Sequence, residues 1–534
     1  MTKALPQALY KLTATIIFVF FGPLALRAQL IYQPYSYQFY QKLDSAFYST
    51  SNSLHTSLKP YIINDSSSLK PVYNALMNRG VDSSRKSWFL RKLFNEHLFD
   101  VKNKEFTFYL DFLPDLMIGR EFIDKTTTWL NTRGYQAGGT IGSKFFFYTS
   151  GYENQGDFAS YVNAYIVHTG VVPGQAYNFN GAAATKDWNY VTALLGYNPT
   201  KSVGIEIGID KTFVGDGYRS MLLADYAQNY PLLRLKFNIG KKIQYMAMWA
   251  YLQDQYAIKF DSLSQHPPNR IKWGAFHYVD WTITNRASLG FFNALIAPEA
   301  YDDGSRHGFD INYINPVLFV ASWAPKGPIP DHTLIGFNGR YKIWDKTAVY
   351  AQFVKDQFAS AGNSKTGYQV GIRGADLFKV KTFHYLLEFN TTKPYTYATS
   401  YTLVNYTELS EPLAHPFGAN FKELVGILNY SAGRFDFQGE LNFAKYGLNM
   451  QNLNYGKDLL LADANPQGDV TGQGLKTNFA YAQGKIAYVI NPKYNLRLEA
   501  GAVIRKESNT QFNNRTVLLT FGLRSTFRDL YTDF

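Results

Sequence analysis

The chain alternates apolar and polar residues through most of its length. In segment 434–447, "RFDFQGELNFAKYG", Phe435, Phe437, Leu441 and Phe443 fall on one face, and the residues between them are mostly polar. A period of two is typical of a β-strand with one apolar and one polar face. Similar runs recur from residue 105 onward. We therefore predict that residues 105–534 form an all-β domain.

Eighteen segments share this alternation. Their predicted first residues are 105, 128, 142, 186, 202, 229, 241, 270, 286, 333, 346, 365, 380, 421, 434, 475, 494 and 514. An even number of antiparallel strands is usual for a single-chain outer-membrane barrel. Very short turns join 229 to 241 and 333 to 346, whereas long polar stretches fill 298–332, 391–420 and 446–474. Such a barrel has short turns on one rim and long loops on the other.

Residues 29–104 follow a different pattern. Phe39, Leu43 and Phe47 are four residues apart, and segment 83–99 repeats a helical spacing of leucines and phenylalanines. Spacings of three and four place apolar residues on one face of a helix. We predict a small helical segment here that plugs or supports the barrel on its periplasmic side.

The first 28 residues have the pattern of a secretory signal peptide. Lys3 and Lys11 precede an apolar run that ends at the small residue Ala28. This order of positive, apolar and small residues predicts cleavage near Ala28 and export of the mature chain. A retained anchor helix is the alternative, which Pro23 disfavours. No other run approaches the roughly 20 apolar residues that a spanning helix needs.

Composition narrows the function classes. Aromatic residues make up 17% of the chain, yet its mean hydropathy is −0.23. That combination suits many half-apolar strands. The chain has no cysteine, which excludes disulfides, thiolate metal sites and a cysteine nucleophile. Its net charge of +12 is spread over 534 residues without a dense basic run, so we predict no nucleic-acid partner.

Three features favour an apolar face that meets lipid over the core of a secreted sandwich or propeller. The polar faces carry both signs of charge, which suits a wet lumen: Arg434, Asp436 and Glu440 on one predicted strand, and Arg497, Glu499 and Arg505 on another. The terminal Phe534 follows an amphipathic segment and resembles the insertion signal of outer-membrane proteins. Tryptophans, which favour the membrane–water boundary, lie near predicted strand ends: Trp129, Trp188, Trp249, Trp273, Trp281 and Trp344. Because lipid tolerates no unpaired sheet edge, the barrel must close.

Several stretches carry a family resemblance. They are "DKTFVGDGYRSMLLADYAQNYPLLRLKF" (210–237), "INYINPVLFVASW" (311–323), "TLIGFNGRYKIW" (333–344), "LEFNTTKPYTYA" (387–398), "PLAHPFGANFKE" (412–423) and "FGLRSTFRDLYTDF" (521–534). Together they resemble the capsule-assembly Wzi family, in the branch described as gliding-motility protein RemB, over roughly residues 30–534. The resemblance implies an outer-membrane barrel of eighteen strands with a periplasmic helical bundle. It also implies a role in holding capsular polysaccharide and a link to gliding motility.

No pattern in the sequence predicts catalysis. His384 and Glu388 have the spacing of a helical metal pair, but on a strand they lie about 13 Å apart. The segment "GDGYRS" (215–220) has neither the spacing nor the following helix of a phosphate loop. A nucleophile elbow is also missing from the sequence. We predict a non-enzymatic protein without a metal or cofactor.

Glycan binding is the sharper hypothesis. Sugars are held by hydrogen bonds from carboxylates, amides and arginines, and by aromatic faces that stack on the ring. Clusters of these types at predicted strand ends are Asp216, Tyr218 and Arg219; Asn390, Tyr395 and Tyr397; and His415 with Asn420. Each residue could instead brace a loop or the plug.

The sequence thus predicts an outer-membrane barrel that binds, anchors or helps assemble surface polysaccharide in connection with gliding motility. The expected partners are surface or capsular polysaccharide, outer-membrane lipid, and other motility or surface-export proteins. Alternatives are a porin or solute-uptake channel, an enzyme acting on lipid or glycan, and a scaffold for motility proteins.

Overall fold

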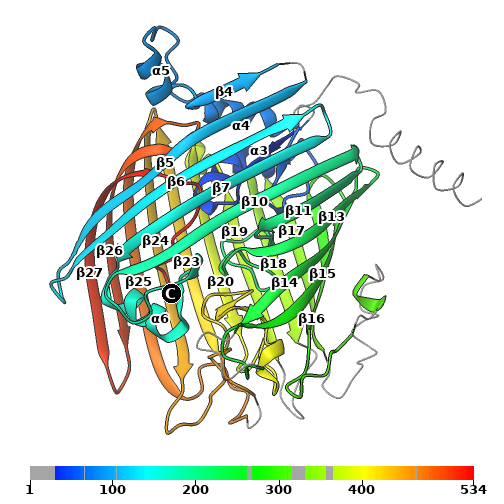
Figure 1. Ribbon diagram of the computed structural model, residues 1–534, viewed down its shortest axis with the longest axis vertical. Coiled ribbons are helices and arrows are strands. Elements are labelled where there is room, and N and C mark those ends of the chain that lie inside the picture. The colour runs from blue at the N-terminus through cyan, green and yellow to red at the C-terminus, as the bar shows by residue number, and fades with distance from the viewer. Residues whose placement is uncertain are drawn as a thin grey trace, which may run out of the picture.

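The described part of the chain is dominated by one closed barrel (Figure 1). The computed structural model describes residues 30–64, 67–103, 105–260, 268–308, 311–314, 331–356, 365–463 and 466–534. The predicted signal peptide and most of the stretch 311–323 lie outside these residues. Within the described ranges, eighteen antiparallel strands form the barrel, which confirms the predicted fold class.

The barrel strands follow one another in chain order. They are β5 (Phe106–Glu121), β6 (Thr127–Ile141), β7 (Phe145–Asp157), β10 (Lys186–Thr200), β11 (Val203–Asp210), β13 (Tyr230–Ile239), β14 (Ile243–Asp254), β15 (Arg270–Thr282), β16 (Ala287–Pro298), β17 (His332–Trp344), β18 (Thr347–Asp356), β19 (Thr366–Gly374), β20 (Phe383–Thr392), β23 (Phe421–Ala432), β24 (Phe435–Leu448), β25 (Leu475–Asn491), β26 (Leu496–Ser508) and β27 (Asn513–Ser525). Each begins within three residues of its predicted start. Strand β27 pairs with β5 and closes the ring.

The outer face of the barrel is apolar. In β24, Leu441 is 50% exposed, whereas its neighbour Glu440, which faces inward, is 4% exposed. The same alternation around the ring leaves a belt of leucine, isoleucine and phenylalanine side chains on the outside, as expected for a wall that meets lipid. Trp273, Trp281 and Trp344 are exposed near strand ends, as predicted. For Trp188 the prediction was wrong, because this residue has inward parity on β10 and is fully buried.

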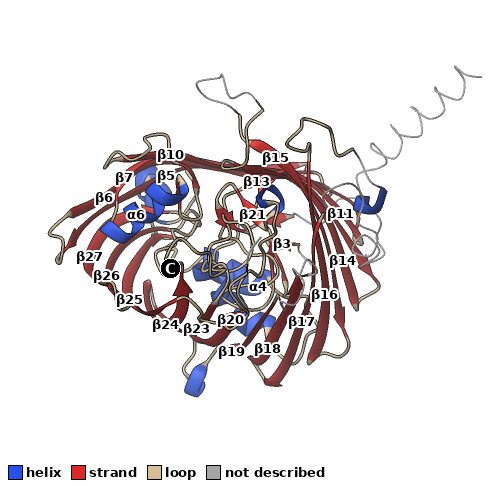
Figure 2. Cartoon of the chain, turned by 90° about the horizontal axis from the view of Figure 1, so that it is seen from below, coloured by secondary structure: helices blue, strands red, loops and turns tan. Residues whose placement is uncertain are grey.

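The two rims differ in the way that the sequence predicted. Turns 201–202, 240–242, 345–346 and 433–434 lie on the upper rim in Figure 1, and the long connections leave from the lower rim. Loops 211–229 and 393–420 fold back into the barrel, so that loops and short helices occupy the ring of strands (Figure 2). The lumen is therefore filled with protein.

The N-terminal segment lies at the short-turn rim and enters the lumen. Its helical elements are α2 (Tyr37–Tyr40), η1 (Gln41–Leu43), α3 (Asp44–Phe47), α4 (Lys70–Met77) and α5 (Trp88–Phe94). The sequence predicted a helical segment over 29–104, but the structure also has short strands there. Strand β1 (Ile31–Tyr32) pairs with β3 (Ile62–Ile63), and β2 (Leu58–Lys59) pairs with β12 (Phe213–Val214). Among the described residues, no helix has the length and apolarity to cross a membrane.

Strand β4 (Phe99–Lys102) also lies inside the segment predicted to be helical. Strand β27 pairs with β5 only from Asp115 onward, which leaves the first half of β5 without that neighbour. There β4 takes the place of β27 and pairs with Thr107–Leu110 of β5. The barrel wall thus begins a few residues before the predicted boundary at residue 105.

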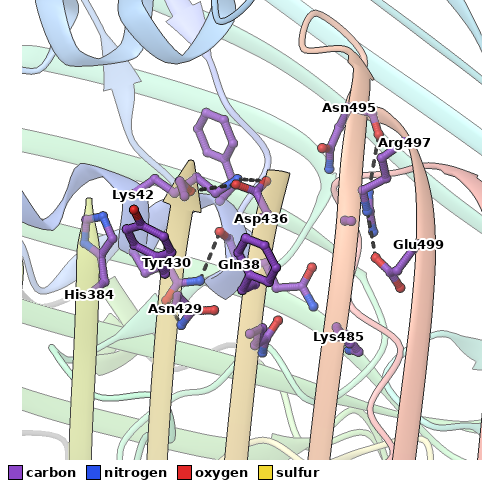
Figure 3. Close-up of a pocket in the computed structure, with 16 residues that line it drawn as sticks. Gln38, Lys42, His384, Asn429, Tyr430, Asp436, Lys485, Asn495, Arg497 and Glu499 are labelled. Atoms are coloured by element: carbon purple, nitrogen blue, oxygen red, sulfur yellow. Dashed lines mark hydrogen bonds and ion pairs between the residues drawn. The ribbon is translucent and has the colours of Figure 1, made fainter. Parts of the chain in front are cut away.

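Ion pairs fix the N-terminal segment to the wall. Lys42 lies 2.6 Å from a carboxylate oxygen of Asp436 at the start of β24 (Figure 3). Arg79 lies 2.6 Å from the other carboxylate oxygen of Asp436. Deeper in the lumen, Arg373 of β19 contacts Asp44 at 2.9 Å, and both side chains are buried. Withdrawing the segment would leave buried charges without partners, which is strongly destabilising.

The C-terminal tail, residues 526–534, follows a path that the sequence analysis did not predict. Strand β27 ends at Ser525, and the chain then turns into the lumen. Phe534 packs there against Tyr165 of α6 (Ser160–Thr169), with ring centroids 4.6 Å apart. Phe534 does follow an amphipathic wall strand but lies inside the barrel, and its resemblance to an insertion signal stays a prediction. Arg528 and Asp533 of the tail are buried and find polar partners inside the barrel.

A lipid-facing wall makes a direct prediction for β24. The change Leu441→Arg should weaken insertion by about 2–4 kcal/mol, the cost of a cation near the middle of the bilayer. Urea-titrated folding into lipid vesicles measures this cost. The matched control is Gln438→Arg, at a lumenal position on the same strand. Equal losses for both variants would contradict a belt that faces lipid.

Candidate functional site

The predicted residue Asp216 lies deep in the lumen against the N-terminal segment. Thr56 donates a hydrogen bond to its carboxylate, and the Tyr48 hydroxyl lies 3.3 Å away. Arg340 of β17 completes the surroundings at 3.8 Å. Asp216 is fully buried. Its position joins the loop 211–229, the N-terminal segment and the wall.

Three other predicted residues converge on Glu423, at the start of β23. The imidazole of His415 lies 2.6 Å from its carboxylate, the Asn390 amide donates to it at 2.8 Å, and Arg219 lies 3.5 Å away. All four side chains are buried. This polar cluster joins two inward loops to strands β20 and β23.

The C-terminal tail ends in the same cluster. Arg219 contacts the Asp533 carboxylate at 2.5 Å, and the Tyr218 hydroxyl donates to it at 2.9 Å. The main-chain nitrogen of Tyr218 donates to Glu388 at 2.9 Å. The segment 218–219 therefore holds the tail against the wall.

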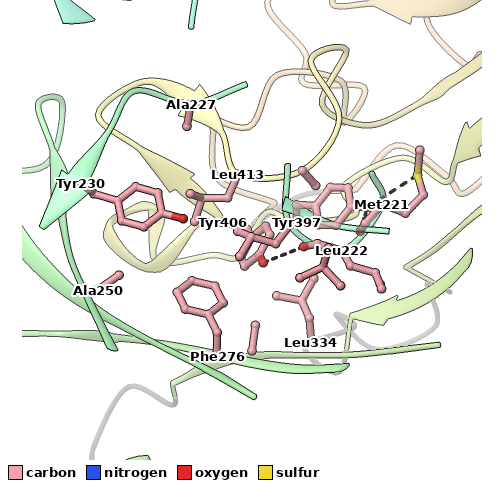
Figure 4. Packing of buried hydrophobic residues seen from close by; sticks show 14 of the residues in the cluster. Met221, Leu222, Ala227, Tyr230, Ala250, Phe276, Leu334, Tyr397, Tyr406 and Leu413 are labelled. Carbon is pink, nitrogen blue, oxygen red and sulfur yellow. Dashed lines mark hydrogen bonds between the residues drawn. The ribbon is translucent and has the colours of Figure 1, made fainter. Parts of the chain in front are cut away.

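The remaining predicted residues brace loops from inside. The Tyr397 hydroxyl donates to the main-chain oxygen of Met221 at 2.7 Å, in the apolar packing of Figure 4. The Tyr395 hydroxyl donates to the oxygen of Asn454 at 2.7 Å. Asn420 donates to the main-chain oxygens of Gly447 at the end of β24 and of Gln473 in the loop that precedes β25. These three residues do not join the cluster around Glu423.

The structure thus brings Tyr218, Arg219, Asn390 and His415 together and places Asp216, Tyr395, Tyr397 and Asn420 elsewhere. Every one of the eight has hydrogen-bond or ionic partners within the chain. Binding of glycan by these residues stays a prediction.

A cavity of about 550 Å³ opens at the long-loop rim, beside α6 and the C-terminal tail. We call it the rim cavity. Its walls come from α6, the loops 393–420 and 449–474, the ends of β24 and β26, and Phe534. The main lining side chains are Tyr161, Tyr165, His168, Phe417, Tyr446, Lys457, Asp458, Arg505, Glu507 and Phe534.

Aromatic rings form much of its wall. Tyr161 and Tyr165 project from α6, where they are four residues apart and share one face. Phe534 packs against both rings. On the opposite side, Phe417 and Tyr446 pack with centroids 5.5 Å apart. Rigid rings of this kind offer flat apolar faces to a ligand at low conformational cost.

Charged groups stand among the rings. The Lys457 ammonium lies 4.8 Å from the centre of the Tyr446 ring, and the Arg505 guanidinium lies 4.4 Å from that of Tyr161. Arg505 also contacts Glu507 at 3.0 Å. The cavity therefore combines stacking surfaces with donors and acceptors, as small-ligand sites do.

Sequence reasoning missed most of this cavity. The stretch "PLAHPFGANFKE" does contribute Phe417 and Gly418 to its wall. Tyr161, Lys457 and Arg505 come from three distant segments whose local patterns are those of an ordinary helix, loop and strand. Only the folded barrel brings them together.

The hairpin of β21 (Thr407–Glu408) and β22 (Glu411–Pro412) lies beside the cavity and holds two buried carboxyls. Glu408 accepts hydrogen bonds from Gln228 and from the main chain of Gln253. Glu411 accepts one from the main chain of Gly174 at 2.8 Å. Burial raises the pKa of Glu408 to about 7 and the pKa of Glu411 to about 8. Within the described residues, no three acidic or histidine side chains form a metal-binding group.

Comparison with known proteins identifies the fold. No family model matches the sequence, and no curated protein matches it either. A solved structure from Escherichia coli, Wzi, is described as a carbohydrate-binding β-barrel involved in group 1 capsule assembly. It superposes with a TM-score of 0.54 at 12% identity, over 93% of this chain and 99% of its own.

Two further solved structures match less of the chain. OprD from Pseudomonas aeruginosa has a TM-score of 0.43 at 9% identity, over 78% of this chain and 94% of its own. OccAB2 from Acinetobacter baumannii has a TM-score of 0.43 at 9% identity, over 78% of this chain and 97% of its own. Only the superposition on Wzi supports a conclusion: the chain shares the fold of that outer-membrane barrel.

The carboxyls of the hairpin predict a pH dependence. A carboxyl whose pKa rises on folding keeps its proton in the folded chain where the unfolded chain has lost it. Stability should therefore be unaffected below the unfolded pKa of 4.5 and fall as the pH rises toward 8. The natural chain should therefore lose free energy of unfolding between pH 5 and 8. In Glu411→Gln this loss should be smaller by roughly 1–4 kcal/mol, at about 1.4 kcal/mol per pKa unit.

Thermal denaturation of the detergent-solubilised chain at the two pH values measures the effect. Glutamine keeps the acceptor for Gly174 and should leave stability at pH 5 nearly unchanged. An identical fall in the variant and the natural chain would contradict the raised pKa.

Proposed function

We propose that this chain is a non-enzymatic outer-membrane barrel that binds surface polysaccharide in the rim cavity and so anchors it to the cell. The observation that carries the proposal is the combination of stacking rings and charged donors at the rim with the long loops. Long loops face the outside of the cell in outer-membrane barrels, so a polymer at the surface would reach this cavity first. Export by the predicted signal peptide is part of the proposal.

The chemistry of the cavity supports a sugar ligand. The apolar faces of a pyranose ring can stack on Tyr161 or Phe534, while hydroxyl groups can exchange hydrogen bonds with Asp458 and Lys457. An open cavity of this size suits a few residues within a longer polymer, since the loops leave one side accessible to solvent. The shared fold with the carbohydrate-binding barrel Wzi agrees with this proposal.

A solute channel is the second candidate, and the filled lumen argues against it. Buried charges tie the N-terminal segment and one inward loop to the wall, through Asp44 with Arg373 and Arg219 with Glu423. The tail is tied to the same loop through Asp533 and Arg219. Opening a pore would break several of these pairs at once, and each broken pair is costly. A tether needs no such opening.

The cavity predicts which single change weakens binding. Lys457→Met keeps the length and packing of the side chain over Tyr446 but removes its charge. Loss of a charge-assisted hydrogen bond of about 1.5–3 kcal/mol should weaken retention of purified surface polysaccharide roughly tenfold or more. Binding of that polysaccharide to the immobilised, detergent-solubilised chain measures the loss.

Lys445→Met is the matched control, because Lys445 lies on β24 close to the same rim but faces outward. It should bind as the natural chain does. If Lys457→Met also binds unchanged, or both variants lose binding equally, the rim cavity is not the polysaccharide site.

The resemblance to the gliding-motility RemB branch extends the proposal to cell movement. A deletion strain should retain less surface polysaccharide and spread less on a soft surface. Staining of the capsule and scoring of colony spreading test both effects. Normal spreading with reduced polysaccharide would remove the link to motility, and normal results in both assays with purified polysaccharide unbound would favour a scaffold.

A further inference from the structure

One part of the outer wall is covered by the chain itself. Ala275 of β15 and Leu295 and Ala297 of β16 have outward parity, yet each is less than 6% exposed. Together with Tyr313 they form a separate apolar cluster, against which Trp249 of β14 packs. Outward residues elsewhere on the wall, such as Leu519 at 49%, remain open.

The cover is a strap formed by residues 299–308 together with Tyr313 and Ile314. The Trp249 indole donates a hydrogen bond to the main-chain oxygen of Tyr313 at 2.7 Å. The Tyr313 hydroxyl lies 3.2 Å from the imidazole of His307, which contacts Asp331 at 2.9 Å. The hydrogen bond from Trp249 thus holds the strap against the apolar wall, and the contacts of His307 hold the strap together.

Between the strap and the wall lies a groove of about 630 Å³. Its wall side consists of outward side chains of β13 to β16: Leu233, Leu235, Trp249, Trp273, Ala275 and Leu295. Pro298, Tyr313 and Ile314 supply most of the strap side, and Glu299, Arg306 and His307 are its polar residues. The groove is therefore almost wholly apolar.

Its position in the membrane follows from two tryptophans of β15. Trp273 and Trp281 are both exposed and lie eight residues apart, which is about 26 Å along the strand and about 20 Å across a bilayer at the usual tilt. They mark the two edges of the hydrocarbon layer. The groove lies at the Trp273 edge, which is the long-loop side.

We propose that this groove holds one acyl chain of a lipid from the outer leaflet. The groove is continuous with the lipid-facing belt, so an acyl chain can enter from the surrounding bilayer without crossing water. Because the acyl chain comes from the bilayer, its contact with the groove rests on van der Waals packing rather than on transfer from water. Arg306 places a guanidinium beside the groove, where it can contact the lipid phosphate. The strap would thus be fixed to the membrane beside the barrel.

Fluorescence quenching tests the proposal. The lipid-free chain in detergent is titrated with phosphatidylglycerol that carries bromine on its acyl chains, since bromine quenches tryptophan on contact. We expect quenching that saturates near equimolar lipid and is lost in the variant Trp249→Phe with Trp273→Phe. Leu235→Gln, inside the groove, should also lose it, and Leu519→Gln on β27 should retain it.

Three results would overturn the proposal. The first is quenching of the natural chain that only rises in proportion to the lipid fraction of the micelles. The second is equal quenching in the variant that lacks both tryptophans. The third is a detergent-stable dimer that protects the groove, which would assign it to a second copy of the chain. The first result concerns the natural chain alone, so it tests the proposal even if a variant fails to fold. Heat-modifiable electrophoretic mobility shows whether each variant has folded.

Discussion

Lipid offers no hydrogen bonds to a peptide backbone, and this constraint organises the whole molecule. Every strand in the bilayer must pair on both sides, so the sheet closes where β27 meets β5. Closure fixes two faces for each strand, and the apolar face must be the outer one. All polar chemistry is thereby directed to the lumen and to the two rims. The alternation of apolar and polar residues in the sequence follows from this constraint.

Because polar side chains are directed inward, the lumen contains many charged groups. Charged side chains that point inward are enclosed by inserted segments and have to be paired. Arg234 contacts Glu206 and Asp210, and Arg524 contacts Asp115 and Glu499. Where the partner belongs to an inserted segment, as Asp44 does, the same pairing fastens that segment to the wall. A filled barrel leaves its rims and its outer wall as the surfaces that can meet ligands.

The strands could be predicted because their pattern is local. Phe435 and its neighbours alternate whatever the rest of the chain does, so strand starts and the asymmetry of the rims followed from the sequence. The positions of loops and of the tail depend on distant partners. The tail turns into the lumen because Asp533 pairs there with Arg219 of a distant loop, and no local pattern announces that pairing. For the same reason, the internal partners of residues predicted to bind glycan, such as Glu423 for His415, could not be predicted, and the rim cavity arises from segments with no shared motif.

A plugged barrel with its recognition surface at the outer rim is the account that joins these observations. The rim cavity offers rings and charges to a polymer outside the cell, and the groove under the strap offers an apolar slot to the membrane around it. The rim cavity depends on a lumen that stays closed, because the inserted tail and loops form its walls. Single-channel recording of the purified chain in planar bilayers tests this most directly. The account predicts no steady conductance, and a stable pore on the nanosiemens scale would contradict it.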